Sequence, residues 1–209
     1  MSGIIGFSPN MKSGVLGKSV SGTTHIKTLD LSGAANTGTT FNSLPFFFSY
    51  SIVITDMIGG QDNAQIDFRF VNSAGSALSS NYNMTAMGIR HDIDSPLSSY
   101  DSSLSSFVAA FDRSHGRPSQ AQLRLSENQG ANNGESLNAT LLYSLGRDAG
   151  NKCLPTLTGT LTTVDNNGAL FGSHIAGNIV ERDTVFTGFY VETNGSNFEN
   201  GTISVSGIN

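Results

Sequence analysis

Hydrophobic and polar residues alternate along most of the chain, which is the period of a β-strand with one buried and one wet face. In SYSIVIT (49–55), Tyr50, Ile52 and Ile54 fall on one face of an extended segment. The same alternation recurs in QIDFRFV (65–71), AQLRLS (121–126) and GTISVSGI (201–208). Each of these segments is therefore predicted to be a strand. In QIDFRFV the pattern places Asp67 and Arg69 on the wet face.

Weaker strand patterns and turn signals fill most of the remaining chain. Further strands are predicted at 26–32, 83–90, 105–111, 138–145, 157–164 and 184–193. Clusters of Gly, Asn, Asp and Ser predict turns at 59–63, 72–76, 128–134, 165–168 and 192–201. No segment predicts a helix longer than two turns, and the Ser-rich stretch 95–107 is interpreted as a loop. Short strands separated by turns predict an all-β fold, a jelly-roll-like antiparallel β-sandwich.

The first 27 residues do not follow this pattern. They are rich in Gly and Ser, with small apolar islands and scattered lysines. We predict an extended N-terminal arm over 1–27 and a sandwich body over 28–209. The alternative is a solvated terminus without a partner. As an assembly arm it would make contacts through Ile4, Ile5, Phe7, Lys12, Val15, Leu16 and Lys18.

Charge supports the division between arm and body. Charged residues make up 13% of the chain, against about 25% in an average domain. The arm has three lysines and no acid, whereas the remainder has eight basic and sixteen acidic residues. A basic arm on an acidic body indicates docking onto an acidic neighbour, including another copy of the chain. Nucleic-acid binding is not expected, because three lysines form no dense patch and no aromatic platform accompanies them.

The number of cysteines and the hydropathy of the chain further limit the classes of protein to which it can belong. Cys153 is the only cysteine, so no internal disulfide or cysteine cluster can form, and a small buried thiol is expected. The longest apolar block, LPFFFSYSIVI (44–54), is too short to span a bilayer. Membrane insertion is therefore not expected.

Candidate chemistry is sparse. Asp92 and Asp94 would point to the same side of an extended segment, which could hold a divalent cation, although turn residues capping their own backbone are the simpler interpretation. The sequence has no serine-hydrolase elbow, zinc-protease motif or phosphate-binding loop. A glycan-degrading enzyme would need two opposed carboxylates, and nothing in the sequence pairs its glutamates. We expect no catalytic activity and no cofactor.

Loop residues suggest a binding alternative. Arg113 and Arg117 flank His115 in DRSHGR, which suits an anion or a subunit contact. Tyr100 lies in a polar loop where an aromatic ring could meet a sugar. Loops 91–103 and 112–118 would then form the contact of a receptor- or glycan-binding module.

Three stretches resemble small structural proteins of marine tailed bacteriophages. They are the opening MSGIIGFSPNMKSGVLGK (1–18), the segment YSIVITDMIGGQDNAQIDFRFVNSAGSAL (50–78) and the end FTGFYVETNGSNFENGTISVSGIN (186–209), with its closing Gly207-Ile208 pair. The region 90–165 does not share the resemblance.

The resemblance implies a virion protein with a β-sandwich body that assembles as a symmetric oligomer. It carries over no set of functional residues. We therefore expect a structural protein made in the cytoplasm of a bacterial host and displayed on the virion, as a tail-fibre-like appendage or a capsid decoration protein. Its expected partners are itself, as a homotrimer, other capsid or tail proteins, and a host surface glycan or receptor.

Overall fold

The computed structural model describes residues 22–91, 121–129, 131–145, 154–166, 168–181 and 184–208. Over these ranges the chain forms strands and turns but no helix. The strands are β1 (Thr23–Asp30), β2 (Gly38–Phe41), β3 (Ser49–Gly59), β4 (Ala64–Asn72), β5 (Tyr82–His91), β6 (Leu123–Gln129), β7 (Leu137–Ser144), β8 (Thr156–Val164), β9 (Leu170–Ile179), β10 (Phe186–Thr193) and β11 (Phe198–Ile208). The predicted all-β fold is confirmed.

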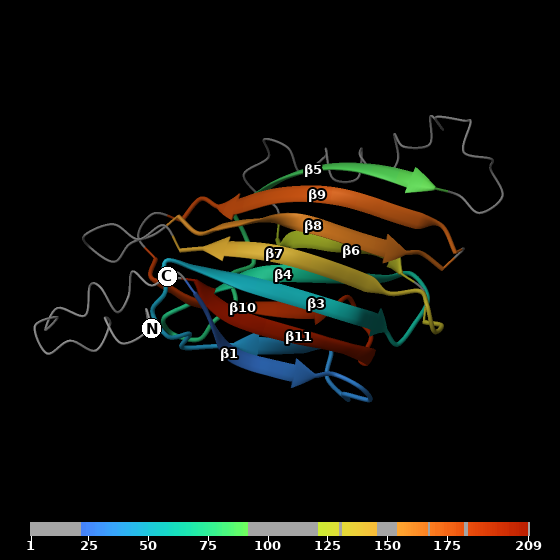
Figure 1. The fold of residues 1–209 in the computed structure, drawn as a ribbon, viewed down its shortest axis with the longest axis horizontal. Helices are drawn as coiled ribbons and strands as arrows, with labels where there is room; N and C mark the ends of the chain where they lie inside the picture. The colour runs from blue at the N-terminus through green and yellow to red at the C-terminus, as the bar shows by residue number, and fades with distance from the viewer. Residues whose placement is uncertain are drawn as a thin grey trace, which may run out of the picture.

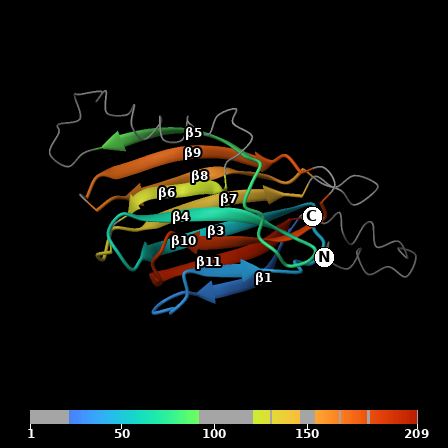
Figure 2. The ribbon, with the colours of Figure 1, turned by 180° about the vertical axis from the view of Figure 1, so that it is seen from behind.

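The strands form a β-sandwich of two antiparallel sheets. The large sheet has seven strands in the order β1-β11-β3-β7-β8-β9-β5, and the small sheet has four in the order β2-β10-β4-β6. Figure 1 shows the molecule with the large sheet in front. Figure 2 shows it turned by 180°, with the small sheet in front. Without β5, β8 and β9, the orders become β1-β11-β3-β7 and β2-β10-β4-β6. This alternation of the chain between two four-stranded sheets is that of a jelly roll. Strands β8 and β9 then extend the large sheet as a meander from β7.

The core lies between the sheets and is rich in aromatic residues. On β3, Tyr50, Ile52 and Ile54 are buried as their alternation predicts. Phe68 of β4 stacks on Phe189 of β10, with ring centroids 5.2 Å apart. Offset and edge-to-face ring contacts of this kind add about 0.5–1.5 kcal/mol each beyond the area that they bury.

Three buried tyrosines hold their hydroxyl groups within the sandwich. Tyr143 on β7 donates to the carbonyl oxygen of Gly188 on β10 at 3.2 Å, which links the two sheets. Tyr50 donates to the carbonyl oxygen of Pro45 at 2.7 Å, and Tyr82 donates to that of Leu78 at 3.0 Å. A buried hydroxyl without a partner would destabilise the fold, so these bonds fix the positions of the rings.

The sequence pattern missed two strands, β2 and β9. β2 has only four residues, which is too few for an alternation to be seen. β9 carries Ser173 and Gly177 among its inward positions, and these residues interrupt the apolar series that would have revealed it. The predicted strand at 105–111 lies outside the described residues.

Strand β1 begins inside the range assigned to the arm. Thr23 pairs with Ile208 of β11, and the pairing continues along β1 to Asp30. Residues 23–27 therefore belong to the large sheet. Residues 1–21, with all seven residues proposed as assembly contacts, lie outside the described part of the chain.

Candidate functional site

The outer face of the large sheet carries no charged side chain over the regular part of four neighbouring strands, and the exposed acids Asp56 of β3 and Glu199 of β11 lie beyond that part. On β11, β3, β7 and β8, alternation places hydroxyl, amide and a few apolar side chains outward. These outward residues are Thr202, Ser204, Ser206 and Ile208, then Ser49, Ser51, Val53 and Thr55, then Asn138, Thr140, Leu142 and Ser144, and finally Thr156, Thr158, Thr160 and Thr162. Such a face can bind a partner without removing water from a charge.

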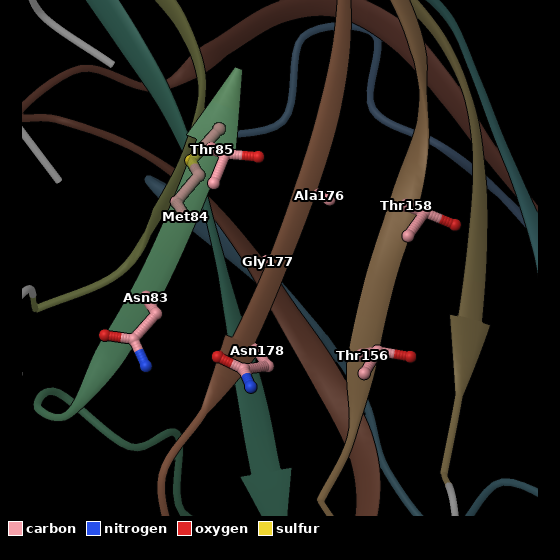
Figure 3. A pocket seen from close by; sticks show the side chains of 8 residues that line it. All are labelled: Asn83, Met84, Thr85, Thr156, Thr158, Ala176, Gly177 and Asn178. Atoms are coloured by element: carbon pink, nitrogen blue, oxygen red, sulfur yellow. The ribbon is translucent and has the colours of Figure 1, made fainter. Parts of the chain in front are cut away.

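A hollow of about 350 Å³ lies on this face where β5, β9 and β8 run side by side. Figure 3 shows polar side chains from all three strands on the same side of the sheet. The lining residues are Asn83, Met84, Thr85, Thr156, Thr158, Ala176, Gly177 and Asn178. None of these side chains is ionisable, so the lining offers hydrogen bonds and not acid–base chemistry.

The pairing register explains the shape of the hollow. Asn83, Asn178 and Thr156 form one row across the three strands, and Ala176 lies in the middle of the next row, between Thr85 and Thr158. Adjacent strands are about 4.8 Å apart and alternate residues about 7 Å apart, so the polar groups mark the edges of a frame of about 10 by 7 Å. The small side chain of Ala176 leaves the centre of the frame open.

Packing below the sheet fixes the floor of the hollow. A Cβ atom at Gly177 would lie 2.6 Å from a methyl carbon of Leu123 on β6. Leu123 is buried and can approach β9 this closely only because residue 177 is glycine. The strand that carries Ala176 and Asn178 is therefore supported from the small sheet.

The polar side chains of the hollow are available to a ligand. Among the residues that the structure describes, Asn83, Thr85, Thr156, Thr158 and Asn178 make no side-chain hydrogen bond. Asn83, Thr158 and Asn178 are half-buried. Each amide both donates and accepts hydrogen bonds, and each hydroxyl does the same.

A second hollow of about 280 Å³ lies over β3, β7 and β8 on the same face. The one side-chain amide in its lining, that of Asn138, already makes hydrogen bonds within the protein. The side-chain oxygen of Asn138 accepts a hydrogen bond from the backbone N–H of Asp56 at 2.9 Å. The side-chain nitrogen of Asn138 donates to the hydroxyl of Ser136 at 3.3 Å. The two hollows therefore differ in what they can offer to a ligand.

The outer face of the small sheet carries a charged network instead. Arg124 Nε lies 3.3 Å from Asp67 Oδ1, and Gln122 donates to Asp67 Oδ2 at 2.8 Å. Arg69 pairs with Glu192 at 2.5 Å and donates to Gln122 Oε1 at 3.1 Å. The charges of the two acidic and two basic side chains balance. Gln122 connects the two ion pairs, because it is hydrogen-bonded to Asp67 of one and to Arg69 of the other.

The prediction that Asp67 is exposed to water is wrong. Asp67 does lie on the other face of β4 from Ile66, Phe68 and Phe70, but it is only 1% exposed. Burial raises the pKa of Asp67 to about 6, although the neighbouring Arg124 acts in the opposite direction. Alternation gives the side of the sheet on which a residue lies, and it does not show which long side chains fold over it.

Two phenylalanines form an exposed apolar pair just before β3. Phe46 is 55% exposed and Phe48 is 74% exposed, with their rings edge to face at 6.1 Å. Phe48 precedes Ser49, which pairs with Ile208, and Ile208 pairs with Thr23. The pair therefore lies within about two strand spacings, roughly 10 Å, of the start of β1.

The residues predicted to form sites are not among those that the structure describes. This applies to Asp92 and Asp94 as cation ligands, and to Tyr100, Arg113, His115 and Arg117 as loop contacts. Within the described ranges no group of three or more His, Cys, Asp or Glu side chains could hold a metal ion. In the same ranges no helix is long and apolar enough to cross a membrane.

The predicted strands 83–90 and 157–164 include Asn83 and Thr158, but the sequence did not predict the hollow. The missing strand was β9, which supplies Ala176 and Asn178 between the other two. Comparison with protein-family models, curated proteins and solved structures finds no match to the chain.

Proposed function

We propose that the chain is a non-enzymatic structural protein of a bacteriophage virion, displayed as a tail-fibre-like appendage or a capsid decoration protein. It would assemble through its N-terminal arm and its β-sandwich, as a homotrimer. The observation that carries this proposal is the position of β1. This exposed strand lies at the edge of a jelly-roll-like sandwich, directly after the segment that has the composition of an arm.

An edge strand of this kind suits assembly. β1 is hydrogen-bonded to β11 on one side, and most of its residues are exposed. The backbone groups on the other side of an edge strand can pair with an added strand from another chain. The exposed pair of Phe46 and Phe48 lies nearby and offers an apolar surface.

The segment before β1 is suited to lie along such a surface. Its glycines let the backbone approach a neighbour closely, and Ile4, Ile5 and Phe7 can fill apolar pockets. Ordering an extended arm costs about 1–2 kcal/mol per residue, so contacts with a partner must offset that cost. Copies held in fixed geometry on a particle reduce the cost by raising the effective concentration.

Two features favour a structural role over catalysis. The lining of the larger hollow has no ionisable side chain. Two of the glutamates are engaged with other side chains of the protein, Glu192 with Arg69 and Glu181 with Asn81.

The test is the solution mass of the full chain beside a chain that lacks residues 1–21. The truncation must stop before Thr23, because removing residues 1–27 would delete five of the eight residues of β1 and most of its pairing with β11. We expect an oligomer that dissociates to monomers when the arm is removed. An unchanged mass would contradict assembly through the arm.

A further inference from the structure

We propose that the hollow over β5, β8 and β9 binds a neutral saccharide. This is a separate activity from the structural role, and it does not depend on the loops predicted as a glycan contact. The lining consists of amide, hydroxyl and small apolar groups. His174 lies one row beyond Ala176 on β9 and is not part of the lining.

The arrangement of the polar groups matches a sugar ring. Asn83 and Asn178 are neighbours on adjacent strands, at one end of the frame. A side-chain amide can donate to one hydroxyl of a vicinal diol and accept from the next. Thr85 and Thr158 stand on either side of Ala176 in the adjoining row. Hydroxyls on opposite edges of a pyranose could therefore be bound at the same time.

The floor suits the C–H face of the ring. The side chain of Ala176 and the backbone of Gly177 contribute apolar surface there, and the threonine methyl groups add to it. The Met84 side chain points away from the hollow, into the core. At about 350 Å³ the hollow is near the lower limit for ligand pockets. It has room for a ligand of roughly one or two sugar rings and not for a folded peptide.

The polar groups of the lining also favour a polyhydroxylated ligand, because their hydrogen-bonding capacity is not used by other side chains of the described residues. The half-buried amides and hydroxyls have no side-chain partner among the described residues, so water satisfies them when no ligand is bound. Saccharide hydroxyls can replace those waters with equivalent hydrogen bonds. A shallow site gives weak binding, which display in many copies would strengthen.

The experiment measures binding of the full chain to immobilised neutral oligosaccharides of glucose, galactose, mannose and N-acetylglucosamine. Sialylated and sulfated glycans serve as charged comparisons. The neutral saccharide that binds best is then titrated against Asn178→Ala, Thr158→Val and Thr160→Val. The last variant is the matched control, because Thr160 is the next outward threonine of β8 and lines only the second hollow. Thermal melts establish that each variant is folded.

We expect a neutral saccharide to bind, with affinity lowered about fivefold in Thr158→Val and tenfold or more in Asn178→Ala. Thr160→Val should bind as the unaltered chain does. The proposal is overturned if no neutral saccharide binds, if only charged glycans bind, or if Thr160→Val loses as much affinity as Thr158→Val. None of these results bears on the oligomeric mass, so the structural role is tested separately.

Discussion

Stability should fall as the pH rises through the titration of Asp67. In an unfolded chain this carboxyl has a pKa of 3.8, whereas burial raises its pKa to about 6 in the folded protein. The folded state therefore holds the proton more tightly. The stabilisation linked to that proton is complete below about pH 4 and is lost as the pH rises through about 6. The difference between the two pKa values corresponds to about 3 kcal/mol of unfolding free energy.

The matched variant is Asp67→Asn, which keeps the shape and one acceptor for Arg124 and Gln122 but does not titrate. Urea unfolding followed by circular dichroism gives the unfolding free energy of both proteins from about pH 4 to about pH 7. Other carboxyl groups titrate in both, so the informative quantity is the difference between the two curves. We expect the advantage of the unaltered chain over the variant to shrink by about 3 kcal/mol across this range.

A difference that stays flat, or that grows with pH, would refute this reasoning. A flat difference would mean that the ion pair with Arg124, at 3.3 Å, cancels the cost of burying the carboxylate, and a growing difference would mean that the ion pair outweighs it. The usual expectation for a paired surface aspartate is the opposite pH dependence. The sign of the pH dependence therefore shows whether burial or the ion pair has the larger effect on the pKa of Asp67.

Two further substitutions test the packing between the sheets. In Gly188→Ala the added Cβ would lie 1.8 Å from the backbone oxygen of Phe41, so thermal unfolding should show a loss of about 3 kcal/mol. Gly172→Ala is its control, because no heavy atom lies within 4 Å of the added Cβ, and a comparable loss there would contradict the explanation. Tyr143→Phe removes the 3.2 Å hydrogen bond to Gly188 and should cost about 1 kcal/mol in urea unfolding. An unchanged midpoint would show that the bond does not stabilise the sandwich.

Much of the sandwich can be predicted from sequence because its strands bury one face. Tyr50, Ile52 and Ile54 are buried at alternate positions, as the period-two pattern requires. The turn at 72–76 is also predictable. The side-chain oxygen of Asn72 accepts hydrogen bonds from the backbone N–H groups of Ala74 and Ser76, which is a short-range effect of residue type.

The remainder depends on contacts between distant parts of the chain. The hollow requires Asn83 to lie beside Asn178, and no local pattern specifies that register. The pattern of β9 is obscured because Gly177 is required by Leu123, from another strand and the other sheet. The burial of Asp67 likewise depends on Arg124 of β6 and on Gln122, the residue before that strand.

The most direct test of the proposed role is light scattering on the full chain, on the chain lacking residues 1–21, and on a variant with Ile4, Ile5 and Phe7 changed to serine. The variant keeps the length and charge of the arm, so it isolates the apolar contacts. We expect the full chain to be a trimer and both altered chains to be monomers that still unfold cooperatively, at a lower temperature than the trimer. If all three chains have the same mass, the arm does not hold copies together, and the central claim of assembly through the arm is wrong.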